Sequence, residues 1–416
     1  MNKKIIKNSL FFSGSQIIAR FIGFLNFIFL ARLLSVPDFG IFVWVLGFVY
    51  NFYPLADFGL ERLVLKELSR KPQKAQFYFS RLIPLRIFLS IGTVLVCLLA
   101  ATAMGIEKQK LLFIFLFSLT ILPQNLIFLI AAIKNSQEKA KTFSILTILI
   151  SLLPMIVGIT MVLTNQSSSL LFLSFFSSEL LILLILLSQI QKLDLKLAWK
   201  LDISFGKKLL AQSWPMACLT ILAVFYLRIS LILTGKLLGN YWAGIYGAAS
   251  KFVEAGILIP QGLALALFPS FSRLLIKDKK KLANIYQKAV LILFLLSLPI
   301  AAAMFWGGSW IIPLIFGHQY QPAISVFSLF GVLMIFFFTN CLAGNIIQNS
   351  KKVKSFIPWA AANFLVALMC GLILIPKMGI IGGVWAMIGG EIFGLIINNI
   401  FVFRILKTKV NNHETI

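Results

Sequence analysis

Long apolar stretches separated by short polar loops run along the whole chain. About twelve of them reach roughly 20 residues, the length that an α-helix needs to cross a bilayer. A helix satisfies its own backbone hydrogen bonds in lipid, and the alternating pattern of a membrane β-barrel is absent. The pattern therefore predicts an all-α polytopic membrane protein. The twelve predicted spans are residues 9–33, 39–58, 82–104, 111–133, 142–164, 169–190, 210–234, 241–270, 286–306, 321–347, 355–376 and 379–404.

Composition agrees with a membrane protein and argues against a nucleic-acid-binding protein. The chain has 416 residues, of which 60% are hydrophobic, and a mean hydropathy of +0.96. Soluble domains contain roughly 45–50% apolar residues. The net charge of +25 would suggest a nucleic-acid partner, but the cations are dispersed among short loops on one side of the predicted membrane. We therefore expect no nucleic acid, and anionic membrane lipids as a secondary partner.

The distribution of Lys and Arg predicts the orientation. If the N-terminus is cytoplasmic, most cations fall in the inside loops, as the positive-inside rule requires. The outside loops hold only Arg32, Lys108, Lys110, Lys236 and Lys377. Both termini are then cytoplasmic. The first apolar run is too long for a signal-peptide core, so we expect it to be a retained span.

An internal repeat relates the two halves of the chain. The segment RLLSVPDFGIF (Arg32–Phe42) aligns without a gap on KLLGNYWAGIY (Lys236–Tyr246), an offset of 204 residues. Further along, IKNSQEKAKTF resembles IQNSKKVKSF and places Asn135 on Asn349. A weaker match places Glu179 on Glu391, although any one of these matches could be a chance apolar alignment.

Three matches in one order predict two six-helix lobes. These are residues 1–190 and 209–416, joined by a cytoplasmic linker at 191–208. An even number of spans in each half gives both lobes the same orientation, so a parallel repeat about an axis along the membrane normal is expected.

Charged residues within the spans are candidates for function, because a charge in lipid is costly unless it is paired or lines a polar pathway. Arg20 lies deep in the first span. With the offset of 204 residues, Arg228 in the seventh span aligns with Phe24, which is one helical turn after Arg20. Lys251 and Glu254 share a face of the eighth span. The alternatives are snorkelling, an ion pair of Arg20 with Asp57 or Glu61, and simple neutralisation of Lys251 by Glu254.

Other charged positions have plainer interpretations. Asp57 and Glu61 lie four residues apart near the cytoplasmic end of the second span. Arg86 is close to the inner end of the third span, and we expect it to snorkel. Glu179 and Glu391 are mid-span acids, for which a protonated structural carboxyl and a functional one are equally reasonable.

Motifs for catalysis are missing from the sequence. There is no G-x-x-x-x-G-K-[ST] phosphate loop, H-E-x-x-H or G-x-S-x-G. The two histidines are far apart, and all four cysteines fall in apolar runs, so neither a metal site nor disulfides are expected. We therefore expect no enzyme activity, and no cofactor apart from a coupling ion, H⁺ or Na⁺.

The sequence resembles a known family at several places. ARLLSVPDFGIF (Ala31–Phe42), LADFGL (Leu55–Leu60), the stretch Ser213–Leu274, IFGHQYQPA (Ile315–Ala323) and Asn363–Ile388 look like the polysaccharide flippases of the Wzx type. These belong to the multidrug/oligosaccharidyl-lipid/polysaccharide exporter superfamily. One difference is that many members carry an Asp two residues after the arginine of the seventh span, where this chain has Ser230.

The resemblance implies two six-helix lobes around a central V-shaped cavity in a bacterial inner membrane. It also implies transport of an undecaprenyl-pyrophosphate-linked oligosaccharide to the outer leaflet by alternating access, for O-antigen or another surface polysaccharide. A polysaccharide polymerase and a chain-length regulator are the expected protein partners.

For a flippase of this type, Arg20, Arg228 and Lys251 are the expected substrate-binding residues, since cations hold pyrophosphate by charge-assisted hydrogen bonds. Asp57, Glu61 and Glu254 would tune those cations or carry the coupling ion.

Three other functions are considered. A multidrug or metabolite cation antiporter of the same superfamily would favour an acidic cavity, and the three cations argue against it. A lipid II flippase usually has two more spans. A non-transporting scaffold for glycan assembly would tolerate the loss of Arg20, Arg228 and Lys251.

Overall fold

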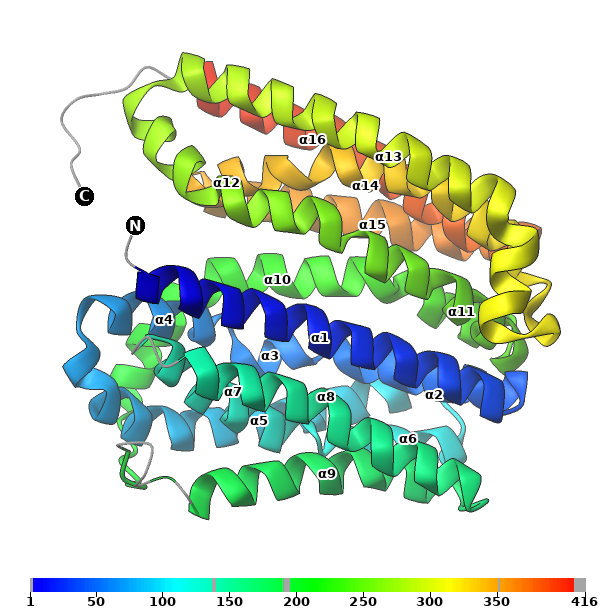
Figure 1. Cartoon of the computed structure of the whole chain (residues 1–416), viewed down its shortest axis with the longest axis horizontal. Helices are drawn as coiled ribbons and strands as arrows, with labels where there is room; N and C mark the ends of the chain where they lie inside the picture. Colours follow the sequence, from blue (N-terminus) through cyan, green and yellow to red (C-terminus); the bar gives the residue numbers. More distant parts are fainter. Residues whose placement is uncertain (1–2, 137–139, 189, 191–194, 351, 408–416) are drawn as a thin grey trace. The chain divides into compact units, whose positions relative to one another are not determined.

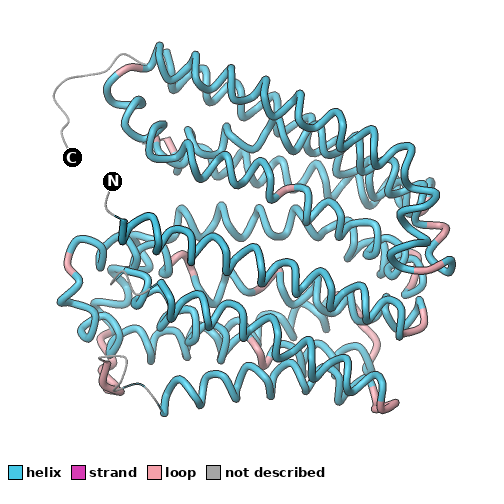
Figure 2. Tube along the Cα trace, in the orientation of Figure 1, coloured by secondary structure: helices cyan, strands magenta, loops and turns pink. Residues whose placement is uncertain are grey.

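The computed structural model describes residues 3–136, 140–188, 190, 195–350 and 352–407. Helices joined by loops make up this part of the chain (Figures 1 and 2). Twelve segments of it are long and apolar enough to cross a membrane. This confirms the all-α class and the number of spans. Residues 191–194 of the predicted linker and the last nine residues lie outside the described part.

The first half of the chain contains nine α-helices and a short 3₁₀ turn in its described residues. They are α1 (Lys3–Leu33), α2 (Val36–Tyr50), α3 (Tyr53–Asp57), α4 (Leu60–Arg70), η1 (Pro72–Lys74), α5 (Ala75–Ala103), α6 (Lys108–Ser118), α7 (Ile121–Ser136), α8 (Ala140–Leu163) and α9 (Ser168–Ser188).

The second half contains seven α-helices and a 3₁₀ turn in its described residues. They are α10 (Ile203–Leu237), α11 (Asn240–Gly256), α12 (Leu258–Lys277), α13 (Lys279–Phe316), η3 (His318–Tyr320), α14 (Ala323–Asn349), α15 (Val353–Met378) and α16 (Ile380–Lys407).

The helices group into two compact units. Unit 1 comprises Met1–Ser35 and Ile41–Val224, and unit 2 comprises Val36–Gly40 and Phe225–Ile416. Helix α10 contributes to both, and the first residues of α2 belong to unit 2. The lobe boundaries predicted from the sequence, with a linker at 191–208, stay a prediction.

One helix lies at the centre of each unit. In unit 1, α7 contacts α3, α4, α5, α8 and α9; in unit 2, α14 contacts α11, α12, α13, α15 and α16. The second repeat match, Asn135 on Asn349, pairs these same two helices, since each residue lies in the last turn of its helix. The second repeat match in the sequence therefore aligns the central helix of unit 1, α7, with the central helix of unit 2, α14.

Proline breaks three of the spans that the structure describes. The second span stops at Tyr50 and restarts at Tyr53, with Pro54 in the first turn of α3. The fourth span is divided between α6 and α7, with Pro123 in the first turn of α7. The eighth span is divided between α11 and α12, with Pro260 in the first turn of α12. Proline has no N–H to donate and clashes with the carbonyl four residues before it, so a helix that reaches proline tends to end and begin again.

The helix ends reproduce the 204-residue offset. Helix α1 ends at Leu33 and α10 at Leu237, and then α2 begins at Val36 and α11 at Asn240. Figure 1 labels these four helices, and the first residues of α2, Val36–Gly40, pack on α11 within unit 2.

The aligned glycines of the repeat lie against each other. A Cβ added to Gly40 would overlap the backbone carbonyl of Asn240, and one added to Gly244 would overlap that of Val36. The nearest other atoms are backbone atoms of the opposite glycine. Because backbone cannot move aside as a side chain can, α2 and α11 approach this closely only with glycine at both positions.

We therefore predict that Gly40→Ala lowers the thermal stability of the purified protein. The added methyl must force the two backbones apart, and overpacking of this kind costs about 1–3 kcal/mol. Gly92→Ala in α5 is the matched control, because nothing lies within 4 Å of its added Cβ. Removing a helical glycine there should be neutral or stabilising, by up to about 1 kcal/mol. Equal melting temperatures of the two variants would contradict the close contact.

Candidate transport site

A tight turn joins the second span to the amphipathic helix α4. Phe58 and Gly59 both adopt the left-handed conformation, with φ of 48° and 73°. Glycine takes this conformation at little cost, whereas Phe58 must be held in it. The Asp57 carboxylate holds the turn by accepting the N–H of Gly59 at 3.1 Å and that of Glu61 at 3.0 Å. A carboxylate at this place satisfies N–H groups that the first turn of α4 leaves unpaired.

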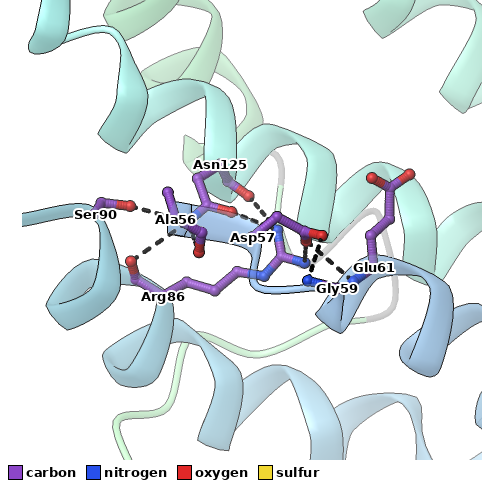
Figure 3. A network of polar contacts seen from close by, with 7 residues as sticks. All are labelled: Ala56, Asp57, Gly59, Glu61, Arg86, Ser90 and Asn125. Atoms are coloured by element: carbon purple, nitrogen blue, oxygen red, sulfur yellow. Dashed lines mark hydrogen bonds and ion pairs between the residues drawn. The ribbon is translucent and has the colours of Figure 1, made fainter. Parts of the chain in front are cut away.

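The same carboxylate forms a buried ion pair with Arg86 of α5. Nη2 of Arg86 donates to Oδ1 of Asp57 at 2.7 Å, and the Arg86 side chain is fully buried. Nη1 of Arg86 donates to the backbone carbonyl and to the side-chain oxygen of Asn125 on α7, at 2.8 and 2.6 Å. Asn125 in turn donates to the Ala56 carbonyl and to Ser90. Figure 3 shows Asp57 and Asn125 at the guanidinium, with Ala56 and Ser90 near the Asn125 amide.

The expectation that Arg86 snorkels is wrong. A snorkelling side chain extends to the water layer, but Arg86 is surrounded by acceptors from two neighbouring helices. The physical reason is that Asp57 and Asn125 together offer the planar guanidinium a charge and two amide oxygens inside the unit. The described ion pair of Asp57 is therefore with Arg86, not with Arg20.

Sequence reasoning missed Asn125 altogether. It is buried in the middle of an apolar stretch, two residues after Pro123. A buried amide in a span must find partners, so this position carried a signal that charge alone does not give. Its partner Arg86 lies 39 residues away in the chain.

Glu61 has an altered acidity. It lies on α4, outside the membrane-spanning segments. Loss of hydration raises the pKa of the Glu61 carboxyl to about 7, and the Asp57 carboxylate adds to the shift against the opposing effect of Arg86 and Arg62. Its carboxyl points away from the Arg86 guanidinium (Figure 3). Glu61 can therefore exchange a proton near neutral pH.

Unit 2 holds a second group of charges. Lys251 donates to Oε2 of Glu254 at 2.6 Å, and Nη2 of Arg228 lies 3.9 Å from Oε1 of the same carboxylate. The structure thus brings together three of the six predicted site residues, across α10 and α11. We call them the α10–α11 charge cluster. Arg228 and Lys251 are about one quarter exposed and Glu254 about one half, so a ligand can reach them.

Arg20 is described on α1, in unit 1, and its side chain is exposed. Asp57 and Glu61 lie close together in the same unit, joined through the α3–α4 turn. The six predicted residues therefore fall into three groups: Arg20, the Asp57–Glu61 turn, and the α10–α11 charge cluster. Their roles in binding stay a prediction.

The two acids paired by the repeat are both buried. Glu179 on α9 is 6% exposed and Glu391 on α16 is 4% exposed. Oε2 of Glu391 accepts from Asn340 on α14 at 2.9 Å, and Asn340 accepts from Asn398 at 2.6 Å. The match that was weakest in the sequence thus joins two acids that lie inside their own units.

The described residues were also compared with the requirements of a metal site and of a disulfide. Among the described residues, no group of three or more His, Cys, Asp or Glu side chains is placed to hold a metal ion. The four cysteines, all within the described part, are free thiols.

Several solved structures have a similar fold. The fold is similar to the lipid II flippase MurJ in an inward closed conformation, with a TM-score of 0.70 and 14% identity over 97% of this chain and 94% of that one. It is also similar to an outward-facing multidrug resistance MATE transporter of the MOP superfamily (TM-score 0.68, 14% identity, 97% of each chain). A MOP superfamily transporter from Pyrococcus furiosus gives 0.63 at 14% identity over 97% of each chain. The chain is thus a multi-pass membrane protein with the MOP transporter fold.

The family follows from the sequence match. Residues 29–325 match the family described as polysaccharide biosynthesis protein, so the chain belongs to that family. A protein of Shigella flexneri named "Putative O-antigen transporter" is 28% identical over 153 residues, which is 36% of each chain. The match thus spans about a third of that relative's length. The chain is therefore a multi-pass membrane protein of the polysaccharide biosynthesis family, with a fold similar to that of MOP superfamily transporters.

We predict that Arg86→Ala strongly destabilises the protein. Removing one partner of a buried ion pair leaves the other charge uncompensated, at a cost of about 3–5 kcal/mol. The matched control is Arg81→Ala, five residues earlier on α5. Arg81 pairs with Asp202 at 3.0 Å near water, where such pairs contribute little. Thermal unfolding of both variants in one detergent measures the difference. A loss for Arg86→Ala no larger than that for Arg81→Ala would contradict the network.

We also predict that Glu61 makes stability depend on pH. Its pKa in the folded protein is about 7, above the ordinary value of 4.5. The folded state then binds the proton more tightly, so the stabilisation is complete below pH 4.5 and is lost as pH rises through 7. Between about pH 5 and 8, the melting temperature of the parent should fall more steeply than that of Glu61→Gln. Glu67→Gln, on the same helix, controls for the lost charge and should follow the parent; parallel curves for all three would refute the assignment.

Proposed function

We propose that this protein moves a lipid-linked oligosaccharide across the bacterial inner membrane. The cargo is an undecaprenyl-pyrophosphate-linked oligosaccharide, carried from the inner to the outer leaflet by alternating access for assembly of a surface polysaccharide. Membership of the polysaccharide biosynthesis family supports the substrate class. The fold shared with a lipid II flippase and a multidrug resistance transporter supports transport rather than catalysis.

The observation that carries the proposal is the composition of the α10–α11 charge cluster. Two cations face one carboxylate, so the three side chains together carry a net positive charge. Guanidinium and ammonium groups that are partly shielded from water hold phosphate oxygens by charge-assisted hydrogen bonds. In this proposal Arg228 and Lys251 bind the pyrophosphate, Arg20 adds a third cation, and Glu254 sets their position and charge.

A coupling ion would supply the energy, since the sequence has no phosphate loop for ATP. Glu61 is the best candidate for a proton, because its pKa of about 7 lets it load and release one near neutral pH. Asp57 would act through Glu61, whose backbone N–H it accepts. Na⁺ is the other candidate ion. A polysaccharide polymerase and a chain-length regulator would receive the cargo on the outer side.

The first test is a strain that lacks this gene. Loss of a flippase should cause undecaprenyl-linked glycan to accumulate in the membrane while surface polysaccharide disappears, and the mass of the glycan identifies the cargo. Unchanged glycan pools with greater sensitivity to cationic dyes would instead indicate a cation antiporter of the same superfamily.

We predict that the triple variant Arg20→Ala, Arg228→Ala, Lys251→Ala fails to restore export in that strain at normal protein level. Export should fall by about tenfold or more, since a charge-assisted hydrogen bond contributes roughly 1.5–3 kcal/mol. The control replaces Lys207, Lys208 and Lys280 with Ala, which removes the same charge from exposed positions. If both triple variants export normally, the three cations do not bind substrate and a scaffold role is favoured.

A further inference from the structure

A cavity of about 400 Å³ lies inside unit 1. Its walls come from α5, α7 and α9, with Phe79, Ile83, Leu129 and Leu187 among them. Its remaining wall is Leu197–Trp199, in the non-helical segment before α10. Every lining residue is apolar. Such a cavity offers water no hydrogen bonds and suits hydrocarbon.

The cavity lies at the depth of the inner leaflet. Helix α5 begins at Ala75 and α9 ends at Ser188, both at the cytoplasmic side by the charge of their loops. Phe79 and Ile87 are four and twelve residues into α5, or about 6 and 18 Å at 1.5 Å per residue. The hydrocarbon core of a bilayer is about 30 Å thick, so the cavity occupies its cytoplasmic half.

Hydrogen bonds attach this non-helical segment to the first turns of α5. Gln76 exchanges two bonds of 2.8 Å with the backbone of Lys196, and the N–H of Lys200 donates to the Ser80 carbonyl at 3.1 Å. This places the backbone of Lys196 and Lys200 on either side of Leu197–Trp199, with both lysine side chains exposed. The path of the segment is thus defined by bonds to α5.

The described residues at this rim carry a positive charge. The nearby acid Asp202 is bound by Arg81 at 3.0 Å, and the Arg81 guanidinium lies over the Phe77 ring at 3.8 Å. Asp202 is therefore neutralised locally, and Lys196 and Lys200 remain to meet an anion. Trp199 is 65% exposed, and Trp favours the membrane–water boundary.

We propose that this cavity binds one acyl chain of an anionic phospholipid of the inner leaflet, with its phosphate held by Lys196 and Lys200. The apolar walls accept the chain, and the two lysines select the charge of the headgroup. A long branched isoprenoid would extend far beyond a cavity of this volume. The bound lipid fastens the segment that leads into α10 to the membrane surface. The site does not depend on the identity of the transported cargo.

Native mass spectrometry of the purified full-length protein tests the proposal. The protein is equilibrated with equal amounts of phosphatidylglycerol and phosphatidylethanolamine, and the lipids it retains are counted. The parent should retain phosphatidylglycerol preferentially. Lys196→Ala with Lys200→Ala should reduce that preference by roughly tenfold, since each lysine near an anionic surface contributes measurably. Lys207→Ala with Lys208→Ala removes the same charge at the start of α10 and should leave it unchanged.

A second set of variants tests the cavity itself. Leu129→Trp fills the cavity and should abolish retention of both lipids. Ala198→Trp does the same from the non-helical segment, where a larger side chain does not disturb helix packing, and it is the variant to use if Leu129→Trp fails to fold. Equal retention of the two phospholipids by the parent would overturn the proposal. So would equal effects of the two lysine pairs, or displacement of phosphatidylglycerol from the cavity by undecaprenyl phosphate.

Discussion

Hydrocarbon offers no hydrogen-bond partner, so each polar group in a span must be satisfied by the protein itself. The Asp57 carboxylate is where unit 1 meets this constraint. One of its oxygens accepts from Arg86 and from the N–H of Glu61, and the other accepts from the N–H of Gly59. Because the same group neutralises a buried cation and caps α4, the second span can end in a sharp turn at this depth. Asn125 extends the network to the central helix α7.

Unit 2 uses its central helix in a related way, with different chemistry. Asn340 on α14 donates to buried Glu391. The 214-residue offset of the second repeat match aligns Asn125 with Thr339, the residue just before Asn340. Each unit therefore has an amide on its central helix that satisfies a charged or acidic group. The α10–α11 charge cluster differs from both networks, because its members are partly exposed and its cations outnumber its acid. That difference separates charges that hold the fold together from charges that can hold a ligand.

The spans were predictable because run length and hydropathy reflect the cost of exposing backbone to lipid, which acts locally along the chain. The 204-residue offset likewise anticipated where α1 and α10 end. The partner of Arg86 was not predictable in this way. Hydropathy assigns a charge by its depth alone, whereas Asp57 and Asn125 reach Arg86 only after α3, α5 and α7 have packed. Of the six predicted site residues, the pair Lys251–Glu254 followed from helical spacing, but the approach of Arg228 to Glu254 required the packing of two helices.

The aligned glycines show how a repeat in the sequence can reflect a contact in the fold. Most aligned positions at this point differ between the halves: Pro37 aligns with Tyr241 and Asp38 with Trp242. Gly40 and Gly244 are identical, and they lie at the place where the two equivalent helices cross. When equivalent segments cross at equivalent residues, a side chain at that position meets its own counterpart, so the steric demand is doubled. Only glycine meets that demand when backbone lies against backbone, and this explains why both halves have glycine here although the residues just before it differ.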